Sequence, residues 1–67
     1  MKATRRERST GRIVYVYATW RGHYRAMRAQ SDDEAWWLVA PNDQMTSHHS
    51  KSEAVARIVD ETRHVAV

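Results

Sequence analysis

Cysteine is absent from the 67 residues of this sequence. Its absence excludes disulfide bonds, cysteine-ligated zinc and thiol catalysis, and it fits a reducing compartment. Glycine occurs only twice, so the sequence offers no glycine-rich loop to hold a phosphate group. A domain this short buries only about 60% of the surface of its unfolded chain. We therefore expect its stability to depend on an aromatic core, on oligomerisation or on a bound partner.

Long hydrophobic runs are missing as well. A membrane span needs about 20 consecutive apolar residues, and the sequence contains no such stretch. The basic residues near the N-terminus are not followed by the apolar segment of a secretory signal. We therefore expect a cytoplasmic protein that does not bind membranes.

Charge is distributed unevenly along the chain. Residues 1–28 contain eight basic side chains and one acidic side chain, whereas residues 29–67 contain three basic and seven acidic ones. Such asymmetry indicates an acidic partner for the first half. Charge carried only for solubility is the alternative interpretation.

The pattern of residues predicts an α+β fold. Residues 1–11 are polar and lack periodicity, so we expect a flexible basic arm whose removal leaves stability unchanged. Residues 12–67 are expected to form a single domain, a three-stranded antiparallel meander packed on one C-terminal helix. The predicted strands cover residues 12–20, 23–30 and 35–40, with a turn over 31–34 and a polar loop over 42–49.

The helix is predicted from its start signal and its periodicity. Ser50 and Glu53 have the spacing of a capping box, in which each side chain bonds the backbone amide of the other residue. Apolar or small side chains then recur at steps of three and four residues, and we expect them to face the sheet: Val55, Ile58, Val59, Thr62 and Val65.

Side chains alternate between the two faces of a strand, so a turn fixes which residues share a face. A two-residue turn at Arg21-Gly22 places Trp20 opposite His23. The face expected beneath the helix then carries Val14, Val16, Ala18, Trp20, His23, Arg25, Met27 and Ala29. A four-residue turn at 31–34 adds Trp36 and Leu38 to this face and leaves Trp37 on the other, and an odd-length turn would exchange them.

The face without the helix is expected to carry Tyr15, Tyr17, Tyr24, Arg28 and Trp37. Rings and guanidinium groups can bind nucleic acid by stacking. The same residue types anchor protein interfaces, and tyrosines also pack across strands without any further role.

Our leading hypothesis is a small nucleic-acid-binding module, with DNA favoured over RNA. Arg12, Arg21 and Arg28 would contact phosphates, and Tyr15, Tyr17 and Tyr24 would contact bases or sugars, with Trp37 beside them. The arm residues Arg5, Arg6 and Arg8 would add phosphate contacts. The alternative is a protein-interaction module, such as a small inhibitor, an accessory protein or a homodimer, that uses the same face.

Metal binding and catalysis have little support. His48 and His49 are adjacent, and no third ligand stands at metal-site spacing. His23, Tyr24 and Arg25 offer groups for acid–base cleavage of RNA, but a hairpin residue packed beside Trp20 is the simpler interpretation of His23. We expect no metal, no cofactor and no enzymatic activity.

Three short motifs carry a family resemblance: Trp20-Arg21-Gly22, Trp36-Trp37-Leu38 and Ser50-Lys51-Ser52-Glu53-Ala54. Their order resembles the arm-type DNA-binding domain of tyrosine recombinases and its relatives among plant transcription factors. The resemblance implies a three-stranded sheet that lies in the major groove with the helix packed behind it. Pro41-Asn42-Asp43 stands where those families have a glycine.

Overall fold

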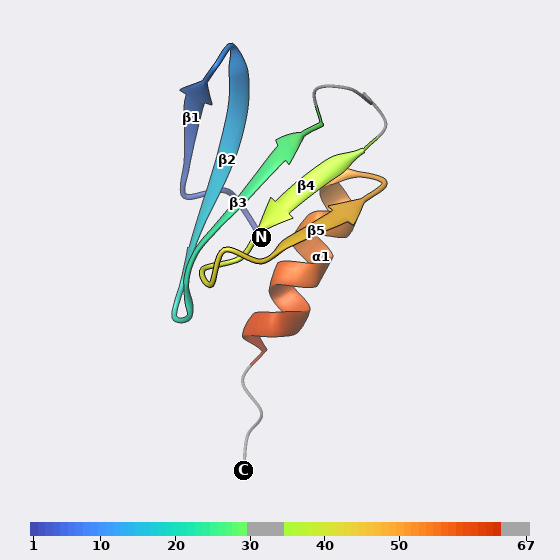
Figure 1. The fold of residues 1–67 in the computed structure, drawn as a ribbon. Coiled ribbons are helices and arrows are strands. Elements are labelled where there is room, and N and C mark those ends of the chain that lie inside the picture. The colour runs from blue at the N-terminus through green and yellow to red at the C-terminus, as the bar shows by residue number, and fades with distance from the viewer. Residues whose placement is uncertain (30–34, 64–67) are drawn as a thin grey trace.

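The computed structural model describes residues 1–29 and 35–63, which form one antiparallel sheet and one helix (Figure 1). The elements are β1 (Arg5–Ser9), β2 (Arg12–Thr19), β3 (Gly22–Arg28), β4 (Trp36–Val39), β5 (Met45–His48) and α1 (Lys51–Thr62). The strands lie side by side in chain order. The α+β class is confirmed, but the sheet has five strands where three were predicted. The predicted turn over 31–34 and Val65 lie outside the described residues.

Strand β1 occupies the segment that was predicted to be a flexible arm. It pairs with β2 along its whole length, from Arg5 opposite Val16 to Ser9 opposite Arg12. The connecting residues Thr10 and Gly11 have φ angles of 50° and 75°, as a two-residue type I′ hairpin turn requires. The arm prediction was wrong because β1 has no apolar residue to show alternation and is held by backbone pairing instead.

Strand β5 lies in the segment that was predicted to be a polar loop. The chain turns after Pro41. The Asp43 amide donates a hydrogen bond of 2.9 Å to the Ala40 carbonyl, and the Ala40 amide donates one of 2.8 Å to the Gln44 carbonyl. It then pairs antiparallel with β4, so that Trp37 faces Ser47. Most side chains of β5 are polar because only its inner side is covered, and the sequence therefore lacked a strand signal.

The β2–β3 hairpin turns one residue earlier than predicted, which shifts the pairing register by two residues. Thr19 pairs with Gly22, so Trp20 and Arg21 form the turn. Gly22 has a φ of 126°, and a Cβ atom there would lie 2.8 Å from the Pro41 Cβ. A shift of two residues along the chain preserves the alternation, so the predicted division of β2 and β3 into two faces is correct.

Helix α1 begins as predicted. The Ser50 hydroxyl accepts a hydrogen bond of 3.1 Å from the Glu53 amide, which confirms the N-cap. The buried face differs from the prediction. Ala54 and Ile58 are fully buried, whereas Val59 is 41% exposed. The helix is thus rotated so that Ala54, and not Val59, packs in the core against the sheet.

The helix covers the sheet face opposite to the one predicted. Tyr17, Tyr24, Ala26 and Leu38 form the core together with Ala54 and Ile58. The predicted core face carries Arg25 between Val16 and Val39. Covering that face would bury an unpaired guanidinium group, which is costly. The tyrosine face has its charged residues at one end, so its centre can be buried.

The register between β3 and β4 groups the tryptophans with other residues of β2 and β3 than predicted. Ala26 pairs with Leu38 and Met27 pairs with Trp37. Leu38 and Trp36 therefore share the helix-covered face, and Trp37 lies on the face that the helix leaves open. Relative to β2 and β3, this is the arrangement expected for an odd-length connection. Because the helix covers the tyrosine face, Trp36 and Leu38 still lie beneath the helix and Trp37 still lies on the uncovered face, as predicted. The helix contacts β3, β4 and β5, whereas the β1–β2 hairpin extends beyond it (Figure 1).

Candidate nucleic-acid interface

Two of the three tyrosines predicted at the binding face are core residues. Tyr17 is 2% exposed and Tyr24 is fully buried. Neither ring can stack on a base while the helix covers this face. The prediction failed because a tyrosine at a strand position is compatible with either face, and its large ring buries more apolar surface than valine does.

Tyr24 and Arg21 belong to a polar network at the C-terminal end of α1. The Tyr24 hydroxyl donates a hydrogen bond of 2.9 Å to the Glu61 carboxylate, which also accepts one from Arg57. The Arg21 guanidinium donates to the Glu61 carbonyl at 3.0 Å, and the Trp20 indole donates to the Thr62 carbonyl at 2.8 Å. The hairpin turn thus satisfies carbonyl groups that a helix end leaves open, and this stabilising contact engages Arg21.

The network makes the stability of the fold depend on pH, through the ionisation of Glu61. Hydrogen bonds from Arg57 and Tyr24 hold the pKa of Glu61 below its ordinary value of 4.5, although burial acts in the opposite direction. A carboxylate with a lowered pKa stabilises the fold above its unfolded pKa, and this contribution is lost as pH falls through the folded pKa. We expect Glu61→Gln to lower the melting temperature at neutral pH. The difference from the wild type should shrink as pH falls below 4.5. Melting curves of both proteins from neutral pH to below pH 4.5 test this prediction. A difference in melting temperature that does not change with pH would contradict it.

A second group of side chains lies where the β1–β2 hairpin extends past the first turn of the helix. We call it the basic aromatic surface and define it by Arg6, Arg8, Tyr15, Arg28, Trp36 and Lys51. Arg6 pairs with Tyr15 across the β1–β2 ladder, and Arg28 pairs with Trp36 across the β3–β4 ladder. Alternation along the strands places all five strand residues on the side of the sheet that faces α1.

Cations and rings are in direct contact within this surface. The Lys51 Nζ atom lies 3.8 Å from the centre of the Tyr15 ring, and the Arg28 guanidinium carbon lies 5.8 Å from the centre of the Trp36 ring. The two rings are 6.0 Å apart and tilted by 43°. Both distances between cation and ring are within the range of cation–π attraction. The rings therefore fix the positions of two positive charges.

The charges of the basic aromatic surface are not neutralised by acidic neighbours. In the part of the chain that the structure describes, the ion pairs join Arg5 to Glu7, Arg21 and Arg57 to Glu61, and His48 to Glu53. None of them includes a cation of this surface. Uncompensated positive charge of this kind attracts polyanions.

The opposite side of the sheet has a different character. We call it the open face, because the helix does not cover it. It carries Arg5 with its partner Glu7, the partly buried Arg12, and the exposed Arg25. Met27, Trp37 and Val39 are partly buried there, and Met45 is 56% exposed. The predicted residues Arg5, Arg12 and Trp37 thus lie on a more apolar face than Arg6, Arg8, Tyr15 and Arg28.

Sequence reasoning missed two members of the basic aromatic surface. Trp36 was predicted on the helix-covered face, where it packs against the core, but its contacts with Arg28 and Tyr15 were not foreseen. Lys51 was considered only as part of the helix start. A residue in the first turn of a helix that packs across a sheet lies near the ends of the strands, and this was the available signal for Lys51.

Searches against protein-family models, curated proteins and solved structures found no match to this chain. Within the described residues, no helix combines the length and the apolar character that a membrane span requires. The interpretation of function therefore depends on the geometry of the surfaces.

Proposed function

We propose that this chain is a small nucleic-acid-binding module that uses the basic aromatic surface. The supporting observation is the grouping of four cations, each without an ion pair among the described residues, on one side of a projecting hairpin. These cations are Arg6, Arg8, Arg28 and Lys51. Phosphate contacts by such residues supply most of the affinity of non-specific nucleic-acid binding.

The contacts within the surface favour binding to the phosphate backbone. The ring of Tyr15 is already occupied by Lys51 at 3.8 Å, and Arg28 lies over Trp36. The rings therefore hold cations in place and leave little aromatic surface for bases. Contacts to phosphates fix position but do not read sequence. We expect binding that tolerates changes of sequence.

The shape of the hairpin favours duplex DNA. Strands β1 and β2 form a two-stranded antiparallel ribbon that extends beyond the helix (Figure 1). The major groove of B-DNA is wide enough to admit such a ribbon, whereas the major groove of A-form RNA is too narrow for side chains to read. Arg6 and Arg8 project from one side of the ribbon, and Arg5 and Arg12 from the other.

The resemblance to arm-type domains implies a different contact surface. In those domains the sheet enters the groove and the helix packs behind it, and the corresponding surface here is the open face with Arg25 and Trp37. Charge favours the basic aromatic surface, because the open face carries Glu7 and more apolar side chains. Substitution of arginines distinguishes the two surfaces, because only those on the surface that contacts DNA should weaken binding when they are removed.

Salt dependence provides the test. With four phosphate contacts, the logarithm of the affinity for duplex DNA should fall with the logarithm of salt concentration with a slope of about −3.5. We expect Arg6→Ala/Arg8→Ala to make this slope shallower by about two and to weaken binding similarly for unrelated sequences. Fluorescence anisotropy with two unrelated duplexes at several salt concentrations measures both effects.

Arg25→Ala is the matched control, because it removes an exposed arginine from the open face of the same sheet. It should leave the slope unchanged. If Arg25→Ala makes the slope shallower and the double variant does not, binding occurs through the open face. No detectable affinity for DNA or RNA at low salt, where the electrostatic contribution is largest, would rule out nucleic-acid binding.

The open face supports a second candidate, a protein-interaction module that associates with a second copy of itself. Trp37 and Met27 are only partly buried there, and the face carries both the acidic Glu7 and the basic Arg25. A two-fold contact brings the same patch of both copies together, so these opposite charges could pair across it. A melting temperature that rises with protein concentration would favour this candidate.

A further inference from the structure

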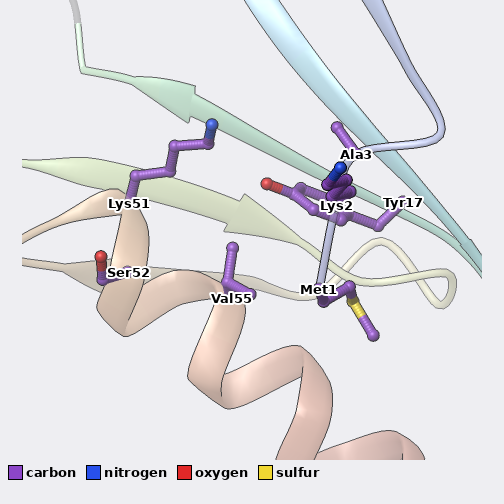
Figure 2. A pocket seen from close by; sticks show the side chains of 7 residues that line it. All are labelled: Met1, Lys2, Ala3, Tyr17, Lys51, Ser52 and Val55. Atoms are coloured by element: carbon purple, nitrogen blue, oxygen red, sulfur yellow. The ribbon is translucent and has the colours of Figure 1, made fainter.

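A cavity of about 470 Å³ lies between the first turns of α1 and the segment that precedes β1 (Figure 2). This volume is within the usual range for small-molecule sites. Its walls combine apolar groups with positive charge and hydroxyl groups. The residues that line it include Lys2, Ala3, Tyr17, Lys51, Ser52 and Val55.

The hydroxyl of Tyr17 opens into this cavity. The residue is 2% exposed, and its hydroxyl has no hydrogen-bond partner among the described residues. Figure 2 shows the hydroxyl on the side of the ring nearest Lys51 and Val55. Tyr24, the other buried tyrosine, differs because its hydroxyl is bonded to Glu61. No fully buried side-chain oxygen lacks a partner among the described residues, so the Tyr17 hydroxyl oxygen is accessible from the cavity and is positioned to bond a ligand there.

The hydroxyl is available as a donor. Burial, followed by the proximity of Tyr15, raises the pKa of Tyr17 above its ordinary value of 10.0. The group therefore keeps its proton at neutral pH and can donate a hydrogen bond to an oxygen atom of a ligand. This favours a ligand that accepts hydrogen bonds.

The helix supplies a positive end to the same cavity. The Ser50 hydroxyl caps the Glu53 amide, and the Ala54 amide bonds the Ser50 carbonyl. The backbone amides of Lys51 and Ser52, the first two residues of the helix, have no partner within the helix. Both residues line the cavity, and Lys51 and Lys2 add positive charge. A helix N-terminus with such charges favours an anion, and phosphate in particular.

We propose that this cavity binds the phosphate monoester group of a nucleotide, either free or at the 5′ end of a strand. The phosphate would accept hydrogen bonds from the Tyr17 hydroxyl and the helix end and would be neutralised by the two lysines. The apolar wall of Ala3 and Val55 would hold the rest of the ligand. No carboxylate is among the residues that line the cavity. This site goes beyond the proposed function, since it shares only Lys51 with the basic aromatic surface and includes Tyr17 and the helix end instead of Arg6 and Arg8.

Tyr17→Phe tests the site, because it removes only the hydroxyl group. Titration of the full chain with thymidine 5′-monophosphate, followed by calorimetry or by NMR shifts of the helix amides, should show binding. Thymidine without the phosphate should not bind. We expect Tyr17→Phe to weaken binding of the monophosphate about tenfold, as for a lost hydrogen bond to a charged group, with an unchanged melting temperature.

Tyr24→Phe is the matched control, because its hydroxyl bonds Glu61 and does not reach the cavity. It should lower the melting temperature and leave binding of the monophosphate unchanged. Single-stranded oligonucleotides with and without a 5′ phosphate show whether the phosphate belongs to a free nucleotide or to the end of a strand. If the phosphorylated strand gains affinity in the wild type but not in Tyr17→Phe, strand ends are ligands. If it gains none while the monophosphate binds, the ligand is the free nucleotide.

The cavity shares Lys51 with the basic aromatic surface but does not include Arg6 or Arg8. Arg6→Ala/Arg8→Ala should weaken binding to duplex DNA and leave binding of the monophosphate unchanged, so failure of either proposal would be visible separately. Equal affinity of the wild type and Tyr17→Phe for the monophosphate would overturn the site. Equal affinity for thymidine and its monophosphate, or no binding of the monophosphate, would overturn it as well.

Discussion

Substitution of Ile58 by alanine should remove much of the stability of this domain. Ile58 is fully buried and packs in the cluster that contains Tyr17, Tyr24 and Leu38. Truncation of a buried isoleucine costs about 2–5 kcal/mol, because apolar contacts are lost and a cavity remains. A domain of this length is expected to have about 3–10 kcal/mol of stability in total. The midpoint of urea unfolding should therefore fall sharply, or the variant should be unfolded without denaturant.

Val59→Ala is the control for this experiment. Val59 follows Ile58 directly and has the same type of side chain, but it is 41% exposed. It was predicted to face the sheet, so the two substitutions test the rotation of the helix as well as the core. We expect Val59→Ala to cost less than about 1 kcal/mol, because surface substitutions have small effects. Equal losses for the two variants would contradict the packing of α1 described above.

Local signals in the sequence were sufficient to predict the helix and its start. The Ser50 cap involves residues three positions apart, so its geometry does not depend on the rest of the fold. The three apolar strands were also identified, because β-branched and aromatic residues are concentrated there. The division of β2 and β3 into faces was correct, since moving the turn by one residue shifts the pairing register by two and leaves the alternation unchanged.

The choice of the buried face depended on interactions between distant segments. Both faces of β2 and β3 carry apolar side chains, so the hydrophobic pattern alone does not select one. Arg25 decides the matter, because it lies at the centre of one face and cannot be buried there without a partner. Tyr24 can be buried because Glu61, 37 residues later, accepts its hydroxyl hydrogen bond. That pairing was not visible in the sequence.

The candidate site was predicted only in part for the same reason. Arg6, Arg8, Tyr15 and Arg28 were selected for their residue types, and the structure places them on one side of the sheet. Their grouping with Lys51 depends on the helix crossing that side. The wrong face of β2 and β3 was expected to be exposed, so Tyr17 and Tyr24 were predicted to bind although they are buried, whereas Trp37 lies on the uncovered face as predicted.

Strand β1 was missed because its side chains carry no apolar pattern. All five of its residues are exposed, and the turn residue Thr10 is an uncommon choice for a position with positive φ. The evidence for the strand is in the backbone. The Thr4 amide bonds the Val16 carbonyl at 2.8 Å, and the Ala18 amide bonds the Thr4 hydroxyl at 2.9 Å. Ala3 packs against the core.

Removal of residues 1–9 should therefore destabilise the domain strongly, contrary to the expectation for a flexible arm. Val14 and Val16 are 6% and 0% exposed, and they pair with Glu7 and Arg5 of the deleted strand. Burial of a valine contributes about 1.5–3 kcal/mol, so exposure of the two would consume much of the expected stability. Full-length Arg6→Ala/Arg8→Ala keeps the backbone of β1 while removing charge, and it should melt near the wild-type temperature. If the truncated chain also melts at that temperature, β1 contributes nothing to the fold. If only the truncated chain has a lowered melting temperature, the backbone of β1, rather than its charge, holds the sheet together.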